Sequence, residues 1–497
     1  MNFFFKNNKS LKKKLNKKLK KSKKKPKSLR RNKIRNKISR NNGNKREYSM
    51  ELNSVNDIFQ KKINESLRKK KGKIPKLNMV KKTSKVGATS LKLSNISEIK
   101  KITCNIVDKL KKQNSTKHLG SGVTNRVDLV CLDDKCTYKA AFRFMPISKD
   151  YYIGGTMTDS HPVEVERRLL EELTKLNNPH FIKLYSNLQC DYTTVIDEGN
   201  EMYLEYNKKV ENNEISRQLN IMILELANKG TINNYIKDKM LEAANKTNKK
   251  NKNEVYQKII NAFFQILYAI SWGQINIKYF KHGDLHANNV VSGDFTNKIM
   301  VGGSKQETYI KYYILGKIFY IPYDGNCWKI IDFDTFYGKD YDNNKLKVDT
   351  VYEENGVILE NQPGFDSHLI FNSCLGDYMS GKNDTFKDTP LGFFYKHYDD
   401  EYIGDNEETI GFKRIKDYSS FITCAIKDYG KCKKMTSAIK LLDDEIFHQF
   451  IGEEDDARNE NVIHTIDGTN GIPKISELVK THPHIFTPKE LEVEKTK

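Results

Sequence analysis

A polar cluster between two apolar segments places the strongest constraint on how this chain can fold. The cluster, at 281–291, reads KHGDLHANNVV and combines a carboxylate, two imidazoles and terminal carboxamides. Before it, residues 255–277 carry apolar side chains at helical spacing over a broad face, which predicts a buried helix. After it, the apolar run 328–331 ends at the acid Asp332. The sequence therefore predicts a core helix and a core strand, each followed by a loop that carries acidic side chains.

These residue types match the needs of phosphoryl transfer. One carboxylate must orient the attacking hydroxyl and accept its proton, while a carboxamide and a second carboxylate hold Mg2+ against the phosphates. Asp284 fits the first role, and Asn289 and Asp332 fit the second. The alternative is an exposed polar loop after a core helix, because short motifs also match by chance.

The order of these residues resembles the H-R-D-x-x-x-x-N and D-F-G segments of protein kinases. Gly283 stands in place of the arginine, and Asp334 in place of the final glycine. The resemblance implies that ATP and Mg2+ are the cofactors, that Asp284 is the catalytic base, and that Asn289 and Asp332 bind the metal.

An upstream glycine turn lies where kinases have their phosphate-binding loop. Two glycines separated by one residue let the backbone approach phosphate oxygens closely. The stretch resembles G-x-G-x-x-G-x-V, with Asn125 at the third glycine. A plain hairpin turn is the alternative. The resemblance implies nucleotide contacts from Gly120, Ser121, Gly122 and Val127.

The next predicted strand, 138–145, carries the cation for the phosphates. Kinases place a lysine two residues after an alanine, and here Ala141 precedes Arg143 at that spacing. Lys139 shares their face because side chains alternate along a strand. The resemblance implies that Ala141 contacts the nucleotide and that Arg143 or Lys139 is catalytic. Arginine is not equivalent to lysine, since its planar fork needs more room.

An apolar stripe predicts a helix at 162–176, capped by Asp159 or Ser160 and ended by an Asn-Asn-Pro sequence. The resemblance implies that a glutamate of this helix holds the strand cation in place. Glu166 is the first candidate and Glu164 the second. A solvated helix face is the alternative interpretation for either glutamate.

A continuous apolar run at 221–227 predicts a buried strand, and its place in the order resembles the kinase hinge. The resemblance implies that Leu224 lies at the back of the adenine pocket and that Glu225 and Ala227 offer backbone hydrogen bonds. An ordinary core strand is the alternative. The polar stretch before it, 186–217, predicts an irregular insertion.

The joint order of these elements predicts an α+β, bilobal protein-kinase-like fold with a small antiparallel β-sheet lobe and a larger helical lobe. Asp366 would brace the catalytic loop from a helix of the large lobe, or serve as a simple N-cap. The expected domains are a basic arm and linker at 1–100, an N-lobe at 101–226, a C-lobe at 227–460 with an inserted hairpin near 305–325, and a mobile C-terminal tail at 461–497. The insertion and the Asn/Lys richness resemble divergent serine/threonine kinases of giant (nucleocytoplasmic large) DNA viruses.

Charge is segregated along the chain. Residues 1–100 hold 34 Lys or Arg against 5 Asp or Glu, whereas the remaining residues hold 52 against 58. Like-charge blocks stay solvated and disordered, and lysines bind phosphates without sequence specificity. We therefore expect a disordered arm that contacts nucleic acid or another polyanion or carries a nuclear-import signal. A solubilising tail is the alternative.

Membrane and redox signals are weak. No apolar run reaches the roughly 18 residues that span a bilayer, and the first residues lack the usual order of a signal peptide. The eight cysteines include no C-x-x-C, so we expect free thiols in a reducing compartment. These features predict an intracellular protein of the host cytoplasm or nucleus, or one packaged in a virion.

The predicted function is an ATP-dependent phosphotransferase, of the serine/threonine protein kinase type, acting on a protein substrate. The departures at Arg143, Gly283 and Asp334 leave a weak enzyme or an inactive one open. The H-G-D-L-H sequence also resembles aminoglycoside and choline phosphotransferases, so a small-molecule kinase is the first alternative. The others are a catalytically weak pseudokinase tethered to nucleic acid and a nucleic-acid-binding structural protein in which residues 1–100 are the functional part.

Overall fold

A computed structural model of the chain describes residues 96–496 with several gaps. The residues left out within that span are 114–115, 122–124, 154–155, 160, 197, 199, 296–306, 342–362, 380–385, 387, 395–435 and 467–470. The described residues belong to one unit, Ala88–Lys497. The arm predicted for 1–100 lies almost wholly outside them and stays a prediction.

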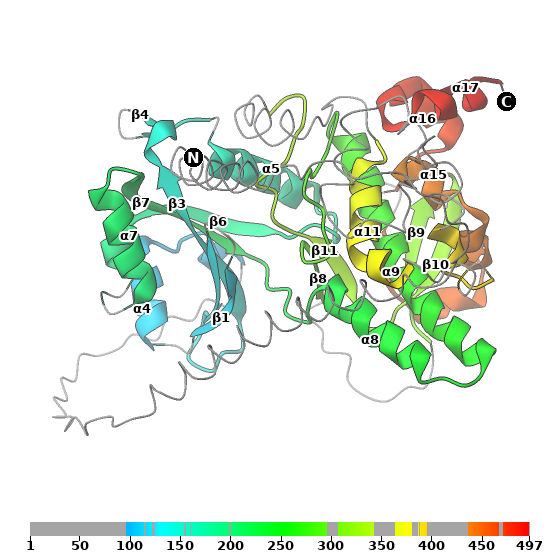
Figure 1. Cartoon of the computed structure of the whole chain (residues 1–497), viewed down its shortest axis with the longest axis horizontal. Coiled ribbons are helices and arrows are strands. Elements are labelled where there is room, and N and C mark those ends of the chain that lie inside the picture. Colours follow the sequence, from blue (N-terminus) through cyan, green and yellow to red (C-terminus); the bar gives the residue numbers. More distant parts are fainter. Residues whose placement is uncertain are drawn as a thin grey trace, which may run out of the picture. The chain divides into compact units, whose positions relative to one another are not determined.

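A five-stranded antiparallel sheet in the order β1-β2-β3-β7-β6 forms the first part of the fold (Figure 1). Its strands are β1 (Thr116–Ser121), β2 (Arg126–Cys131), β3 (Lys139–Ser148), β6 (Leu184–Asp191) and β7 (Ile215–Leu224). The helices of this part are α3 (Ile96–Ile99), α4 (Cys104–Gln113), α5 (Pro162–Leu176), α6 (Tyr192–Val195) and α7 (Glu201–Glu211). A short 3-10 helix (Lys149–Tyr151) leads into a small hairpin of β4 (Tyr152–Ile153) and β5 (Thr156–Met157).

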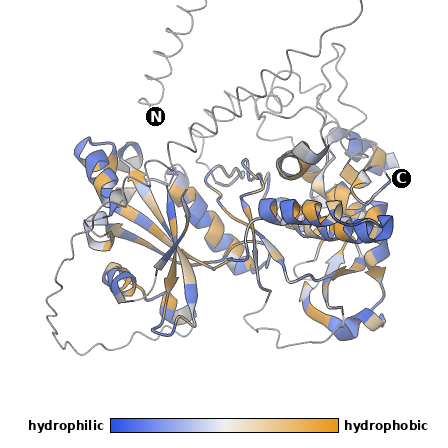
Figure 2. Cartoon of the chain, turned by 60° about the horizontal axis from the view of Figure 1, so that its bottom comes forward, coloured by the Kyte–Doolittle hydropathy of each residue, from blue (hydrophilic) through white to orange (hydrophobic). Residues whose placement is uncertain are grey.

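Strand β3 is buried on both faces, and this double burial fixes where its cation points. Phe142 and Phe144 pack in a cluster that includes residues of α4. Ala141 and Met145 pack in a second cluster that includes residues of α5. Since side chains alternate along a strand, Arg143 points to the α5 side. Polar and apolar residues share the strands of this sheet (Figure 2).

Helix α5 has the predicted bounds, Pro162–Leu176, and its leucine stripe is buried. The predicted caps Asp159 and Ser160 are wrong, because the Nδ1 atom of His161 accepts the hydrogen bond from the first turn. The helix ends at Asn177, which has a left-handed φ of 54°. Asparagine tolerates this conformation better than most residues, which explains the clean stop before the proline.

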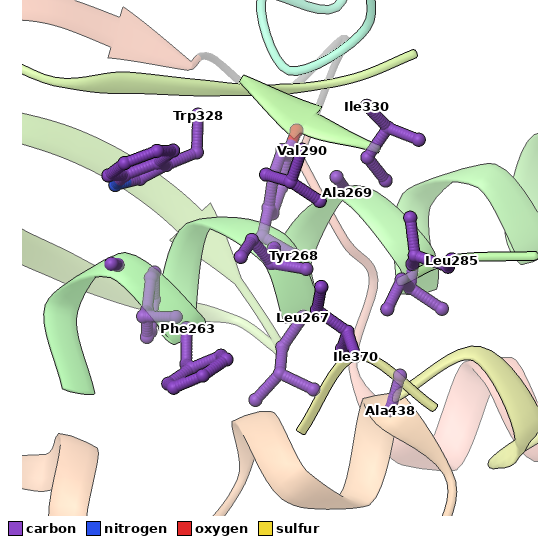
Figure 3. Close-up of a cluster of buried hydrophobic side chains, with 14 of the residues drawn as sticks. Phe263, Leu267, Tyr268, Ala269, Leu285, Val290, Trp328, Ile330, Ile370 and Ala438 are labelled. Atoms are coloured by element: carbon purple, nitrogen blue, oxygen red, sulfur yellow. The ribbon is translucent and has the colours of Figure 1, made fainter. Parts of the chain in front are cut away.

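A long central helix, α9 (Lys249–Asn276), organises the second part, and its residues are buried on nearly all sides from Val255 to Gln274. Figure 3 shows it between Val290 and Trp328 of two strands on one side and Ile370 on the other. Those strands are β8 (Val290–Gly293) and β11 (Cys327–Ile330), which pair antiparallel. The other helices among the described residues are α8 (Ile232–Ala244), α11 (Phe365–Met379), α15 (Ala438–Leu442), α16 (Ile475–Thr481) and α17 (Pro488–Thr496). Three 3-10 helices span Glu445–Phe450, Ala457–Asn461 and Pro483–Ile485.

A second sheet contains the hairpin predicted near 305–325. Strands β9 (Tyr309–Ile314) and β10 (Lys317–Pro322) pair antiparallel around a turn at Leu315 and Gly316. The sheet order is β12-β10-β9-β13, with β12 (Ile451–Gly452) and β13 (Val462–Ile466) at its edges. The chain is thus a mixed α/β protein, which is compatible with the expected class. The bilobal arrangement and the domain boundaries stay predictions.

Two segments are more regular than predicted. Residues 186–217 are not an irregular insertion, since they form the end of β6, helices α6 and α7 and the start of β7. Their scattered apolar side chains, such as Tyr192 and Tyr206, join the α4 cluster. The tail predicted at 461–497 makes regular contacts where the structure describes it: β13 pairs with β9, and Glu490 of α17 accepts a hydrogen bond from the Ser437 N–H at 2.9 Å.

The expectation of free thiols is wrong for four cysteines, because disulfides join Cys104 to Cys190 and Cys131 to Cys136. The first pair is 86 residues apart in sequence, and only the packing of α4 against β6 brings the two sulfur atoms together. Buried free thiols are found at Cys327 and Cys374. Cys424 and Cys432 lie outside the described residues. Within the described part of the chain, no helix has the length and apolar character needed to cross a membrane.

Candidate active site

The loop after α9 is held from below by Asp366, in the first turn of α11. Its two carboxylate oxygens accept hydrogen bonds from the N–H groups of His282 (2.7 Å) and Gly283 (3.0 Å). Burial raises the pKa of Asp366, while His282 and these N–H groups oppose the rise. Gly283 has a φ of 83°, which a residue with a side chain rarely adopts. Asp366 therefore has the bracing position that the resemblance implied.

His282 joins this loop to the segment after β11. Its Nε2 atom lies 2.8 Å from the carbonyl oxygen of Ile331, and its own carbonyl accepts from the Thr335 hydroxyl at 2.9 Å. The Ile331 N–H donates to the carbonyl of Asn289 at 3.0 Å. This hydrogen bond joins the backbone of Asn289 to Ile331, which directly precedes Asp332 in the chain. It therefore brings Asn289 and Asp332 near each other.

Asp284 and Asn289 are in direct contact. The side-chain nitrogen of Asn289 donates to the Asp284 carbonyl oxygen at 2.8 Å, so the side-chain oxygen of Asn289 is left as its acceptor atom. The Asp284 side chain is 36% exposed. Burial raises the pKa of Asp284, while the charges of His286 and His282 lower it and those of Asp334 and Asp332 raise it further. Three carboxylates therefore influence one another here.

Arg143 lies at the centre of a second group of charges. Its Nη1 atom is 2.5 Å from Glu166 Oε1 of α5, and its Nη2 atom is 2.6 Å from Asp332 Oδ1. Glu166 Oε1 also accepts from the Phe333 N–H at 3.1 Å. Three segments, β3, α5 and the loop after β11, therefore meet at one guanidinium. Asp332 has a left-handed φ of 66°, a strained conformation of the kind that occurs at functional sites.

Burial sets the electrostatics of this group. The side chains of Arg143 and Glu166 are 6% and 1% exposed. Burial opposes the positive charge of Arg143, but Glu166, Asp332 and Asp334 outweigh it and raise its pKa. Burial raises the pKa of Glu166 to about 7, and the guanidinium of Arg143 limits that rise. Each charge depends on its partner, because neither is solvated by water.

The structure separates the paired alternatives left by the sequence. Lys139 is exposed at the start of β3, whereas Arg143 is buried against Glu166. Glu164 binds Arg167 on its own helix instead of the strand cation. Arg143 and Glu166 are therefore the pair that this geometry brings together.

The glycine turn is described only in part. Gly120 pairs with Val127, and Ser121 with Arg126, in the β1–β2 ladder. Val127 also pairs with Arg143 across β2 and β3. Gly122 lies outside the described residues, so its predicted contact with the nucleotide stays a prediction.

The hinge-like residues lie at the end of β7 and directly after it, but one of the expected backbone donors is occupied. Leu224 is buried and pairs with Ala141. The Glu225 N–H donates to the Lys183 carbonyl at 2.8 Å, so only its carbonyl is left to meet an adenine edge. Ala227 is partly buried against the core. The expectation of backbone bonds from Glu225 is therefore limited to its acceptor.

Two residues of the site received no site role from the sequence. Asp334 influences the pKa of Arg143, Glu166 and Asp284, and its signal was the second acid of Asp332-Phe333-Asp334. Lys329 is 2% exposed, donates to the Pro179 carbonyl at 2.6 Å and lies 3.2 Å from Glu225 Oε2. Its signal was a lysine inside an apolar run.

The oxygen donors of Asn289 and Asp332 are of the kind that Mg2+ accepts. Among the described residues, no three His, Cys, Asp or Glu side chains are grouped to hold a metal ion. Magnesium in nucleotide enzymes takes only one or two protein carboxylates and completes its shell with water and phosphate oxygens. The side-chain oxygen of Asn289 and the second carboxylate oxygen of Asp332 are donors of that kind. The residues present therefore fit the ion that the resemblance implies.

Comparisons with known proteins support a kinase-like relationship. No model of a known protein family matches the chain. A similar curated protein is the "Putative serine/threonine-protein kinase" of Acanthamoeba polyphaga mimivirus, 26% identical over 246 residues. The alignment covers 46% of this chain and 48% of that protein, so the chain spans about half the length of the relative it matches. Beyond that relationship, the activity and the substrate are matters of proposal.

Proposed function

We propose that this chain is an ATP- and Mg2+-dependent phosphotransferase of the protein kinase type, acting on a hydroxyl of a protein substrate. The observation that carries the proposal is the position of Arg143. It contacts Glu166, 23 residues later in the chain, and Asp332, 189 residues later, in the chain order of a kinase. This position argues against the alternative that Glu166 lies on a solvated helix face, because its side chain is only 1% exposed and contacts an arginine.

The proposed mechanism assigns each part of the site a task. The β1–β2 turn, with Gly120, Ser121 and Gly122, would cover the ATP phosphates, and Arg143 would bind them while Glu166 fixes its orientation. Asn289 and Asp332 would hold Mg2+, which neutralises charge that develops on the phosphates. Asp284 would orient the acceptor hydroxyl and take its proton.

The nucleotide base would lie beside Leu224 and Ala141, at the end of β7. Val127 would cover it from β2, and the carbonyl of Glu225 and the backbone of Ala227 would meet its edge. The buried contact between Lys329 and Glu225 would fix this segment. These assignments predict a preference for purine nucleotides.

The decisive experiment measures phosphoryl transfer from radiolabelled ATP by the full chain. Asp284→Asn should lower the rate by about 10²- to 10⁴-fold, the usual contribution of a general base. The control is Asp134→Asn, the same change on the exposed turn after β2, which should leave the rate unchanged. Equal rates for Asp284→Asn and the original chain refute the proposal.

A binding assay separates an enzyme from a pseudokinase. Mg2+-ATP that binds only the folded chain must raise its unfolding temperature. Arg143→Met should abolish that shift, whereas Lys139→Met should retain it, because Lys139 is exposed and away from Glu166. Binding without transfer would indicate a pseudokinase.

A small-molecule acceptor is the second candidate, and the position of His286 favours it. Serine/threonine kinases commonly have lysine at this place, whereas here His286 Nε2 lies 3.6 Å from Asp284. Parallel screens of a peptide array and a set of hydroxyl metabolites distinguish the two acceptor classes. We also propose that residues 1–100 bind polyanions, so their deletion should remove nucleic-acid binding and leave ATP binding intact.

A further inference from the structure

The loop that carries Asp284 holds a second ionisable side chain, His286, in a defined orientation. The Asn288 N–H donates to His286 Nδ1 at 3.1 Å. The backbone of His286 is fixed as well, since its N–H donates to the Asp284 carbonyl at 2.8 Å and its carbonyl accepts from the Asn289 N–H at 2.9 Å. The ring is therefore anchored on both its backbone and its Nδ1 side.

This anchoring decides which ring nitrogen carries the proton. A backbone N–H can only donate, so Nδ1 must be the acceptor. A neutral imidazole has one donor and one acceptor nitrogen, and its proton therefore lies on Nε2. The same Nε2 atom lies 3.6 Å from Asp284 Oδ2. The ring thus presents an N–H group toward one oxygen of the proposed base.

We propose that His286 is a positioning residue for Asp284, donating its Nε2–H to Oδ2 when nucleotide and acceptor are bound. This inference rests on the function proposed above. A separation of 3.6 Å is longer than a hydrogen bond, but catalytic contacts are often long without substrate and shorten in the reacting complex. Holding Oδ2 leaves Oδ1 directed at the acceptor hydroxyl.

The chemical step then has a defined proton path. The acceptor oxygen forms a bond to the γ-phosphorus as the bond from that phosphorus to the β,γ-bridging oxygen breaks, and ADP leaves with the electron pair. The hydroxyl proton moves to Asp284 Oδ1 and from there to solvent. His286 donates throughout and does not take this proton, because Nδ1 is occupied by the Asn288 N–H.

Two substitutions of His286 separate positioning from bulk. Glutamine retains an N–H donor on a side chain of similar reach, whereas methionine fills the space without a donor. With full-length protein, radiolabelled Mg2+-ATP and casein as acceptor, His286→Met should lower kcat by about 10- to 100-fold, the scale of a misplaced catalytic group. The KM for ATP should stay within about twofold, since only an interaction of the transition state is removed.

The rescue and the control complete the kinetic test. His286→Gln should recover most of the lost kcat. The matched control is His448→Gln, which changes an exposed histidine and should have the original rate. Full activity in His286→Met, or equal losses in the glutamine and methionine variants, overturns the positioning role while the proposed function stands.

A spectroscopic measurement tests the orientation without using activity. In full-length protein with 15N-labelled histidine, long-range proton–nitrogen correlations report the tautomer of each ring. The signal of His286 is the one missing from His286→Gln. An Nε2–H tautomer supports the inference, and an Nδ1–H tautomer overturns it. If the original chain neither transfers phosphate to casein or water nor gains stability from Mg2+-ATP, the proposed function fails, and the catalytic role of His286 fails with it.

Discussion

The two ends of the candidate site are built in different ways. At the end proposed for the phosphates, Arg143 and Glu166 are 6% and 1% exposed and their atoms lie 2.5 Å apart. At the end proposed for the acceptor, Asp284 and His286 are each 36% exposed and 3.6 Å apart. The Arg143–Glu166 pair is in close contact in the folded chain, whereas the Asp284–His286 pair is longer than a hydrogen bond and partly exposed.

This difference has a physical cause. Charges removed from water are stable only with a partner at short distance, so a buried pair has to be assembled with the fold. Half-exposed charges keep water as a partner and tolerate a loose geometry. Mutations should therefore reduce stability at the buried end and affect chiefly the rate at the open end.

The largest loss of stability is expected from Arg143→Met. The substitution leaves Glu166 buried without its cation, and breaking a buried pair in this way costs about 3–5 kcal/mol. Asp284→Asn, at the open end, should change the free energy of unfolding by less than about 1 kcal/mol. Urea unfolding of the full chain measures both.

A double substitution sharpens this test. Replacing a whole buried pair by apolar residues of similar volume is often neutral, so Arg143→Met with Glu166→Met should recover most of the stability lost by Arg143→Met alone. The double variant could instead lose as much stability as Arg143→Met and Glu166→Met lose together. In that case, burial of an unpaired charge is not the cause of the loss in Arg143→Met. The contrast between the two ends would then have no support.

The support of the catalytic loop gives the next effect. Asp366→Ala removes the acceptor of two buried N–H groups, those of His282 and Gly283. Each unsatisfied group costs about 1–3 kcal/mol, and the loop that carries Asp284 should lose its fixed geometry. We expect lower stability together with a lower rate. Asp388→Ala, at an exposed position, is the control and should show neither.

A pH effect of intermediate size should come from His180. Burial lowers its pKa to about 3, and its ring nitrogens lie 2.8 Å from the Trp328 carbonyl and 2.9 Å from the Tyr312 hydroxyl. The unfolded chain binds a proton at this residue below about pH 6.5, whereas the folded chain does not until far lower pH. The contribution of neutral His180 to the free energy of unfolding is therefore fully present above pH 6.5 and is lost as the pH falls from there toward 3.

The size of this effect follows from proton linkage. Between pH 7.5 and pH 5, the residue should account for a loss of about 2 kcal/mol in the free energy of unfolding. His180→Gln should be less stable than the original chain at both pH values. Its free energy of unfolding should, however, fall by about 2 kcal/mol less between pH 7.5 and pH 5. His448→Gln, at an exposed position, should keep it. An unchanged slope in His180→Gln contradicts the prediction.

The parts of the fold that could be predicted follow from local patterns of residues in the sequence. The bounds of α5 follow from its leucine stripe and its proline stop, and the placement of Arg143 follows from alternation along β3. The pairing of Arg143 with Glu166 depended on the kinase resemblance. Helical spacing adds a local signal, because Glu166 lies three and four residues before the buried Leu169 and Leu170.

The parts that were not predictable depend on contacts between distant segments. Residues 186–217 look irregular because their few apolar side chains are buried by α4, far earlier in the chain. Cys104 and Cys190 form a disulfide only because that packing brings them together. Lys329 interacts with the Pro179 carbonyl and with Glu225, and no local sequence pattern indicates either partner.

The smallest predicted effect uses two glutamates of one helix. Residues two apart on a helix lie on nearly opposite faces, and Glu164 binds Arg167 of its own helix while Glu166 binds Arg143. Glu164→Gln should cost only a few tenths of a kcal/mol, as for other pairs within a helix surface. Glu166→Gln should cost several-fold more, because it leaves the buried Arg143 with one carboxylate fewer. Parallel urea unfolding of the two variants makes the comparison, and equal losses would mean that helix propensity, and not the buried ion pair, sets the stability of α5.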